Sequence, residues 1–333
     1  MKLSPSTIIK ICLFVVLGVI FGGSLVFYSH GRGQVHETGD DASMFFSHGE
    51  TKTRHIEKKF TVNSGGNFNL ETDAGEVFVD TWDTDEVQIV VDIEGNDKRT
   101  QKFDVQFFQE GNTIKVVGKI KDHSFFKWNI GDLDVKYTIT LPKKFSVTAN
   151  TSGGNLKVRN VTGEVRCETS GGDVTAESID GQTILNTSGG GIEANLIKGN
   201  VKVETSGGDI RANDITGDFK GNTSGGNINL NTIDGNVYAE TSGGDIDLRV
   251  KGENKGISVH TSGGGITIHV KENIAADVDA STSGGSVKCE LPITIKGTIE
   301  ESELHGRING GGNSIRAETS GGDIRIVTLK NEK

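Results

Sequence analysis

The chain has 333 residues, of which 33% are hydrophobic, 6% are aromatic and 47 are glycine. This composition argues against a wide globular core and suits a thin β structure filled by Val, Ile, Leu and Ala. The formal net charge is −10, and no basic stripe is present, which argues against a nucleic-acid partner and against anionic lipid headgroups.

The N-terminal part predicts a membrane anchor. Residues 11–28 form an uncharged apolar run, which as a helix would be about 27 Å long and would barely span a bilayer core. Because Lys2 and Lys10 precede the run, residues 1–10 are expected in the cytoplasm and the C-terminal part outside a single-pass cell-membrane anchor. A cleaved signal peptide is the alternative, although no clear small-x-small cleavage site follows. Residues 29–53 are polar and patternless, as in a flexible linker.

Residues 54–150 predict an N-terminal β region. Segments 87–95, 103–120 and 133–150 alternate apolar and polar residues as strands do, and Glu-Gly-Asn at 110–112 predicts a hairpin turn. Asn-Ser-Gly-Gly at 63–66 looks like a worn copy of the phrase that organises the rest of the chain. We expect this region to cover the first repeat and to hide its open edge as a cap.

Residues 151–291 are organised by the phrase Thr-Ser-Gly-Gly. It begins at Thr151 and returns every 18 residues until Thr241, then less regularly at Thr261, Thr282 and Thr319. A fixed period near twenty residues is typical of a solenoid, in which each turn of the chain, or rung, stacks on the one before. Counted from the threonine, positions 6, 8, 15 and 17 are mostly apolar and alternate with polar neighbours, which predicts two strands per rung.

The sequence therefore predicts an all-β fold: a single-stranded β-solenoid, or β-helix, of about 18-residue rungs. An irregular N-terminal β region caps it, and one transmembrane helix precedes it. Residues 292–333 supply terminal rungs and a tail, whose final residues, Lys330 to Lys333, are expected to blunt the last sheet edge with charge.

Glycine marks both expected corners of a rung. Glycine reaches positive φ without steric cost, so a tight corner repeated on every rung favours it. One corner is the glycine that recurs at position 13. The other is the Gly-Gly pair, which comprises Gly153, Gly154, Gly171, Gly172, Gly189, Gly190, Gly207, Gly208, Gly225, Gly226, Gly243 and Gly244.

The residues that flank the phrase alternate in charge. The residue before it changes between Asn and Glu from Asn150 to Glu240, and the residue after it alternates Asp with a neutral residue from Asn155 to Asp245. Equivalent residues of stacked rungs lie about 4.8 Å apart, so alternation moves like charges to about twice that distance, where salt screens them. This supports an 18-residue rung. A duplicated 36-residue unit, or a 36-residue rung with two unlike corners, is the alternative.

Acidic pairs at alternate corners are the candidate calcium ligands, since calcium binds six to eight oxygens. The calcium β-roll phrase Gly-Gly-x-Gly-x-Asp is absent, so we expect solvated carboxylates and neither a metal nor a cofactor. The candidates are Glu168, Asp173, Glu204, Asp209, Glu240 and Asp245. The three cysteines have no metal or redox spacing and are expected to be small buried hydrophobes.

No catalytic residues are expected. Outward positions change from rung to rung, as in Arg211, Asn229 and Asp247, and no Ser-His-Asp or Cys-His arrangement stands out. A polysaccharide-acting β-helix enzyme is the alternative, with His260, His269 and His305 in the irregular rungs as the place for such a site.

The chain contains LPKKFSVTANTSGGNLKV, followed by repeated ETSGGDI, after one N-terminal apolar segment. With these features it resembles the bacterial "putative adhesin" or toast-rack β-strand-repeat family of unknown function. The resemblance covers roughly residues 55–330. The family includes membrane-anchored proteins associated with envelope-stress operons, so the resemblance implies a surface-exposed β-solenoid and carries no catalytic residues. We expect a non-enzymatic extracytoplasmic domain that binds an envelope glycan or a membrane or surface protein. An accessory domain of an envelope-stress sensing system is the alternative.

Overall fold

A computed structural model of the chain describes residues 52–121, 133–295 and 300–329. The expected cytoplasmic segment, the expected membrane anchor at 11–28 and nearly all of the expected linker lie outside these residues. The chain divides into two units, Met1–His48 and Gly49–Lys333, and the following description concerns the second. Within the described ranges, no helix has the length and apolar character needed to cross a bilayer.

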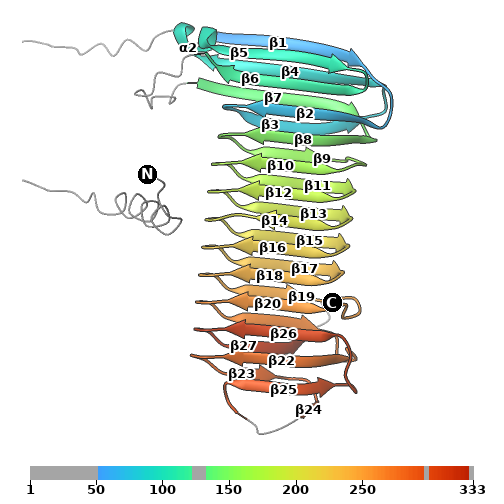
Figure 1. The fold of residues 1–333 in the computed structure, drawn as a ribbon, viewed down its shortest axis with the longest axis vertical. Coiled ribbons are helices and arrows are strands. Elements are labelled where there is room, and N and C mark those ends of the chain that lie inside the picture. The colour runs from blue at the N-terminus through green and yellow to red at the C-terminus, as the bar shows by residue number, and fades with distance from the viewer. Residues whose placement is uncertain (1–51, 122–132, 296–299, 330–333) are drawn as a thin grey trace, which may run out of the picture. The chain divides into compact units, whose positions relative to one another are not determined.

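Two large sheets contain all of the described strands (Figure 1). Sheet A has the strand order β1-β4-β7-β3-β9-β11-β13-β15-β17-β19-β21-β27-β23, and sheet B has the order β24-β25-β22-β26-β20-β18-β16-β14-β12-β10-β8-β2-β6-β5. In the repeats, each rung gives one strand to each sheet. The strands pair in parallel with residues 18 positions away, as Ile192 does with Ile210 and Val201 with Phe219. The 18-residue rung is therefore confirmed, and the 36-residue rung is excluded.

The repeat strands are short and regular. In sheet A they are β9 (Leu156–Arg159), β11 (Val174–Asp180), β13 (Ile192–Lys198), β15 (Ile210–Thr216), β17 (Ile228–Asp234), β19 (Ile246–Arg249) and β21 (Ile266–Val270). In sheet B they are β8 (Phe145–Thr151), β10 (Val165–Thr169), β12 (Thr183–Thr187), β14 (Val201–Glu204), β16 (Phe219–Thr223), β18 (Val237–Thr241) and β20 (Ile257–Thr261).

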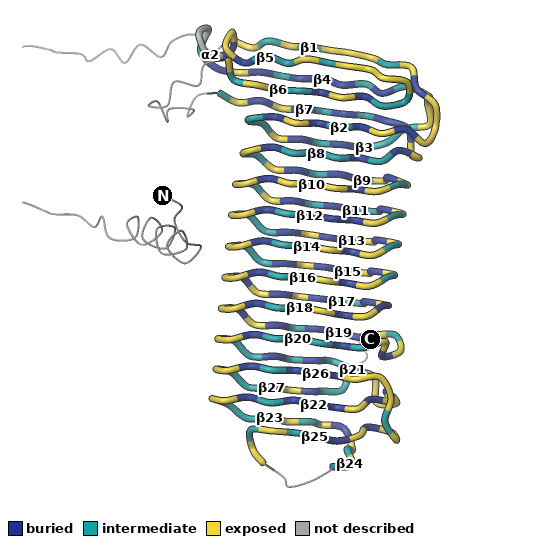
Figure 2. The backbone as a smooth tube through the Cα atoms, viewed as in Figure 1, coloured by how far each residue is buried: buried dark blue, intermediate teal, exposed yellow. Residues whose placement is uncertain are grey.

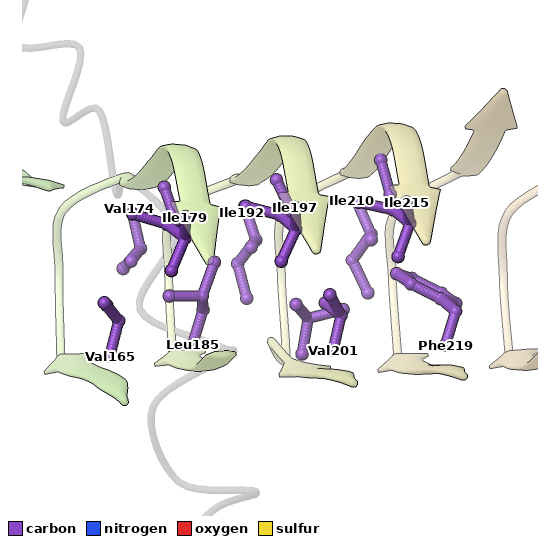
Figure 3. Close-up of a cluster of buried hydrophobic side chains, with 14 of the residues drawn as sticks. Val165, Val174, Ile179, Leu185, Ile192, Ile197, Val201, Ile210, Ile215 and Phe219 are labelled. Atoms are coloured by element: carbon purple, nitrogen blue, oxygen red, sulfur yellow. The ribbon is translucent and has the colours of Figure 1, made fainter. Parts of the chain in front are cut away.

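The core is a column of side chains between the two sheets. Positions 6, 8 and 11 point inward from sheet A and positions 15 and 17 from sheet B (Figure 3), so buried and exposed residues alternate along each strand (Figure 2). Ile210 and Ala212 are fully buried, and Phe219 is 2% exposed. Cys167 occupies an inward position, where burial raises the pKa of its thiol to about 12. This confirms that Cys167 is a small buried hydrophobe.

Each regular rung also bends at position 10, a feature that the sequence pattern did not predict. The residues there have left-handed backbones with φ between 55° and 61°, and they are Asn160, Ser178, Leu196, Asp214 and Thr232. Asn and Asp tolerate this conformation, whereas a left-handed backbone costs other L-residues about 1–2 kcal/mol. Leu196 is 53% exposed, so packing offsets little of that cost.

Leu196→Asn should therefore stabilise the domain. We expect the free energy of unfolding to rise by about 0.5–1 kcal/mol, because asparagine relieves the left-handed strain while little buried surface is lost. Urea denaturation of the single variant measures this. Leu196→Ala is the control, since alanine keeps the strain, and an equal gain from alanine would show that exposed leucine surface is the cause.

The N-terminal region extends both sheets. Its elements are β1 (Lys52–Thr61), β2 (Gly66–Thr72), β3 (Glu76–Trp82), β4 (Glu86–Gly95), α2 (Asp97–Lys102), β5 (Phe103–Glu110), β6 (Thr113–Ile120) and β7 (Leu133–Pro142). The hairpin at 110–112 is confirmed by the antiparallel pairing of β5 with β6. The region covers the open edges of the first rung, because β2 pairs with β8 and β3 pairs with β9. It does so by continuing both sheets, with β1 and β5 as their outermost strands, and not as a separate sheet. Exposed charges on β1, including Lys58 and Lys59, oppose edge-to-edge pairing there.

The worn copy of the phrase is not where the sequence letters suggest. Thr72 pairs in register with Thr151, so Thr-Asp-Ala-Gly at 72–75 takes the place of the phrase. Asn-Ser-Gly-Gly at 63–66 lies at the opposite corner, since Gly66 pairs with Phe145. Similarity of letters was misleading because both corners of a rung favour glycine.

The C-terminal rungs do not stack in chain order. They comprise β22 (Ala276–Thr282), β23 (Val287–Cys289), β24 (Ile293–Ile295), β25 (Glu303–Ile308), β26 (Ser314–Thr319) and β27 (Ile324–Thr328). The last two are inserted strands: β26 lies between β20 and β22, and β27 lies between β21 and β23, parallel to both neighbours. β25 then pairs antiparallel with the outer edge of β22. The expectation that the chain end forms the last edge is wrong, since β23 and β24 are the outermost strands; Lys330 to Lys333 lie outside the described residues.

Candidate functional site

The threonine of the phrase joins one rung to the next. Thr205 Oγ1 donates a hydrogen bond to the carbonyl oxygen of Gly190 on the preceding rung at 2.8 Å, and it accepts one from the Gly208 amide at 3.3 Å. The same two bonds recur at Thr169, Thr187, Thr223, Thr241, Thr261, Thr282 and Thr319. These threonines are buried, so the repeated hydroxyl is a structural group and not a site for a ligand.

Thr205→Val should destabilise the domain by about 1–3 kcal/mol, because it leaves a buried carbonyl and a buried amide without partners while keeping the side-chain shape. Thr205→Ser keeps the hydroxyl and should recover most of that loss. Urea denaturation of both variants measures the difference. Equal losses for valine and serine would assign the cost to the missing methyl group.

The second glycine of each pair is required by the close approach of the backbones. A Cβ on Gly208 would lie 2.1 Å from the Gly190 carbonyl oxygen, and the same clash recurs along the column. The expectation that positive φ requires these glycines holds for Gly154, with φ 116°, but not for Gly172, Gly190 or Gly208. Most position-13 glycines combine both needs, as at Gly199, with φ 145° and a 2.3 Å approach to the Gly181 carbonyl oxygen; Gly235 has the close approach without a positive φ.

The aspartates after the phrase bond to the neighbouring backbone. Asp173, Asp209 and Asp245 each accept, through Oδ1, the amide of the equivalent residue on the next rung, at 2.7 to 2.9 Å. The same bond from Ser286 lowers the pKa of Asp323. Among the glutamates, Glu204 pairs with Lys202 at 3.0 Å, and Glu240 accepts the Tyr238 hydroxyl at 2.6 Å. In the described part of the chain, no three His, Cys, Asp or Glu residues gather as a metal site, and the expectation of solvated carboxylates without a metal stays a prediction.

Charge alternation follows the order of the rungs in space. From Asn150 to Glu240 each neutral residue pairs in register with acids on both sides. Beyond Glu240 the column continues with His260, then Glu318 on an inserted strand, then Ser281. Since the inserted strand keeps the alternation although the chain order is broken, spacing of like charges explains the pattern better than inheritance of a duplicated unit.

The histidines of the C-terminal rungs do not meet. His269 Nε2 lies 3.1 Å from Asp247 Oδ2 on sheet A. On sheet B, His305 Nδ1 lies 3.0 Å from Asp279 Oδ1, and His260 Nδ1 lies 3.8 Å from Glu318 Oε2. Each histidine therefore faces a carboxylate on a different strand, which is the arrangement of surface ion pairs.

Outward side chains of sheet B form two rows along the stack of rungs. The row at position 18 is the alternating acidic column described above. The row at position 16, which we call the position-16 row, places side chains of Arg, Lys and Tyr beside it. In spatial order it contains Thr148, Arg166, Ile184, Lys202, Lys220, Tyr238, Ser258, Arg316 and Asp279.

A groove of about 310 Å³ lies along the position-16 row, where β14, β16 and β18 meet the position-13 corner. We call it the Tyr238 groove. Its lining includes Lys202, Lys220 and Tyr238 of the row and the corner residues Asn200 and Asp218. The lining comes from successive rungs, so the groove crosses β14, β16 and β18, which follow one another along the stack in Figure 1.

Hydrogen bonds fix the polar groups of this groove. Asp218 Oδ1 accepts both the backbone amide and the side-chain amide of Asn236, at 2.9 and 3.0 Å, and these bonds lower the pKa of Asp218. The hydrogen bond to Glu240 raises the pKa of Tyr238 and holds its ring, which is 39% exposed. The groove therefore presents an aromatic surface, an ionised carboxylate and lysine ammonium groups at fixed positions.

A second groove, of about 420 Å³, lies on sheet A near the inserted strands and is lined by Asp245, Asp247, Asp323 and Arg325. Its charges have protein partners, since Arg325 pairs with Asp323 at 2.9 Å and Asp247 faces His269. It offers no aromatic surface. The Tyr238 groove is the stronger candidate for binding a ligand.

Sequence reasoning did not single out Tyr238 or Lys220. The available signal was their shared repeat position, because position 16 points outward and carries an aromatic residue at Tyr238 after two lysines. What the sequence did not show is the groove, which is formed by corner and strand side chains of successive rungs together.

The chain was compared with known proteins. No curated protein matches it. Solved structures that are similar include a putative adhesin from Bacteroides fragilis, at 14% identity and TM-score 0.39, covering 83% of this chain and 97% of that one. A putative lipid binding protein from Parabacteroides distasonis has 15% identity and TM-score 0.32, covering 85% and 98%. A putative cell adhesion protein from Clostridium sporogenes has 12% identity and TM-score 0.25, covering 83% and 100%.

At these TM-scores the structural likenesses carry no argument about function. The family comparison is more decisive, because one family model, Toastrack DUF4097, matches residues 48–327. That range includes both sheets and every copy of the phrase. The chain therefore belongs to the Toastrack DUF4097 family.

Proposed function

We propose that residues 52–329 form a non-enzymatic binding domain for an extended envelope polymer, namely a glycan. The observation that carries the proposal is the register of the outward rows, which places one outward side chain of each row about every 4.8 Å along the stack. A polymer with its own short repeat can contact several rungs at once. Weak contacts then add up through effective concentration, without a deep pocket.

The role of the phrase supports a binding function over a catalytic one. The threonine hydroxyls of the phrase bond to the adjacent rung, and its glycines allow adjacent backbones to approach closely. The charged outward groups mostly pair with neighbours on the same face. What varies from rung to rung is the outward rows, so specificity would reside there.

The proposal includes placement outside a cell membrane. Residues 11–28 would anchor the domain, with Lys2 and Lys10 in the cytoplasm, as the positive-inside rule favours. A domain held at a membrane surface is in position to bind envelope glycans next to it. Protease added outside intact cells should remove the domain, and full protection in intact cells with cleavage only after lysis would contradict this placement.

A purified Gly49–Lys333 piece tests the binding function. We expect it to be retained on at least one class of immobilised envelope polysaccharide, with retention rising steeply with polymer density, because several rungs bind together. The bound polysaccharide should not be hydrolysed during the experiment. Retention on none of the polysaccharides, or release of soluble sugar over time, would contradict a non-enzymatic glycan-binding function.

A further inference from the structure

Lys220, one of the two lysines that line the Tyr238 groove, makes no ion pair with a carboxylate of the described residues. On neighbouring outward positions, Lys202 pairs with Glu204 two residues later, and Arg316 pairs with Glu318 in the same way. Lys220 is followed at that spacing by Asn222, because the acidic column alternates. Within the described residues Lys220 makes no ion pair, and its ammonium lies over the Tyr238 ring, 5.2 Å from the centroid.

The groove also contains a hydrogen-bond acceptor, the Asp218 carboxylate, that can accept a further hydrogen bond. Both bonds from Asn236 end on Asp218 Oδ1, so Oδ2 remains available for a hydroxyl donor. The Asn200 side chain uses its oxygen to accept the Asp218 amide, which leaves its NH₂ group for an acceptor. Donors and acceptors therefore flank an exposed aromatic ring, which is an arrangement suited to the alternating hydroxyl and C–H surface of a pyranose.

The length of the groove suits a polymer more than a single sugar. Its lining extends over four successive rungs, from Gln182 to Tyr238, or roughly 14 Å at the ordinary strand spacing. It is open to solvent, so a chain could reach it from the protein surface.

We propose that the Tyr238 groove binds a uronic-acid residue within a glycan. The sugar carboxylate pairs with the Lys220 ammonium, the pyranose packs on the Tyr238 ring, and a hydroxyl donates to Asp218 Oδ2. This assignment rests on the proposed glycan-binding function and names the sugar class and the site. It favours a negative charge on the sugar, since the ammonium bonds more strongly to a carboxylate than to the hydroxyl oxygens of a neutral sugar.

Titration calorimetry of the Gly49–Lys333 domain can test the assignment with three probes. They are a 1,4-linked hexagalacturonate, a 1,4-linked glucose hexasaccharide and acetate. We expect the hexagalacturonate to bind, the neutral hexasaccharide to bind at least tenfold more weakly, and acetate to give no heat. Absence of hexagalacturonate binding would overturn the proposal, as would equal binding of the neutral chain. Acetate binding that depends on Lys220 would reduce the site to an adventitious ion only.

Variants separate the roles of the groove residues. Lys220→Met keeps the aliphatic stem and should weaken hexagalacturonate binding roughly tenfold while leaving the neutral chain unchanged. Tyr238→Ala should weaken both sugars, and Tyr238→Phe should restore them, because the ring and not its hydroxyl contacts the sugar. Lys157→Met on sheet A is the matched control and should bind like the original domain.

The outcomes distinguish this assignment from the broader proposal. If the Lys220 and Tyr238 variants are retained on immobilised polysaccharide as well as the original domain, the groove assignment is wrong and glycan binding stands on other rungs. If the original domain binds no polysaccharide at all, both fail.

Discussion

We expect Gly172→Ala to lower the free energy of unfolding by about 3 kcal/mol, and Gly171→Ala, one residue earlier, to leave it within about 0.5 kcal/mol. A Cβ on Gly172 would lie 2.1 Å from the Gly154 carbonyl oxygen and 2.7 Å from the Asn155 amide nitrogen, both backbone atoms that no side-chain rotation can move. A Cβ on Gly171 would meet nothing within 4 Å. The adjacent rungs must separate in the first variant and need not change in the second.

Urea denaturation gives the two free energies, and amide hydrogen exchange shows where the loss falls. Because each rung contacts only its neighbours, the increase in exchange should centre on the strands before and after Gly172 and fade along the stack. Similar losses for both variants would mean that the corner requires glycine for its dihedral angles, and not for the approach of one backbone to the next.

Truncation after Asn309 should release residues 276–308 from the rest of the domain. Among the described residues, every strand pairing from this segment to the remaining rungs passes through β26 or β27. Without these inserted strands, β22 and β23 lose their parallel neighbours, and β24 and β25 remain paired only with each other and with β22. Hydrogen exchange should then show loss of protection across 276–308, while the rungs from Val165 to Thr241 keep theirs.

Truncation after Leu329 is the matched control, since it leaves both inserted strands complete, and it should change nothing. Retained protection in the shorter chain would carry a different meaning. It would show that β22 and β23 can dock directly on β20 and β21, which carry the same phrase, so that the inserted strands are dispensable.

The strands and the rung length could be predicted because burial imposes a two-residue period, and stacking imposes a fixed repeat. Val174, Ala176 and their equivalents had to point inward once the sheet faces were assigned. The two corners could also be located, since glycine is rare elsewhere in the repeat. Their cause could not, because positive φ and close approach both select glycine, and only coordinates distinguish them.

The order of the last rungs could not be predicted for a related reason. The phrase at Thr319 has the same letters as those at Thr261 and Thr282, so any of them can stack on any other. The N-terminal extension escaped prediction because antiparallel strands that prolong a sheet have the same alternation as strands that would cover its end. Local pattern fixes a strand's buried face but not its neighbour.

The candidate site was the least accessible to sequence reasoning. The strongest motif drew attention to Thr, Gly and Asp side chains that turned out to bond to the backbone of adjacent rungs. The Tyr238 groove instead depends on a departure from the pattern, an outward lysine whose following residue is neutral. Such a feature becomes visible only after the regular positions have been explained.

The alternating column also constrains how this molecule can change in length. Loss of residues 205–222 would place Glu204 beside Glu240, two negative charges in adjacent rungs, whereas loss of residues 187–222 would place Asn186 beside Glu240. Removal or duplication of rungs in pairs preserves the electrostatic pattern, and removal of a single rung breaks it. Natural or engineered relatives should therefore gain and lose length in even numbers of rungs.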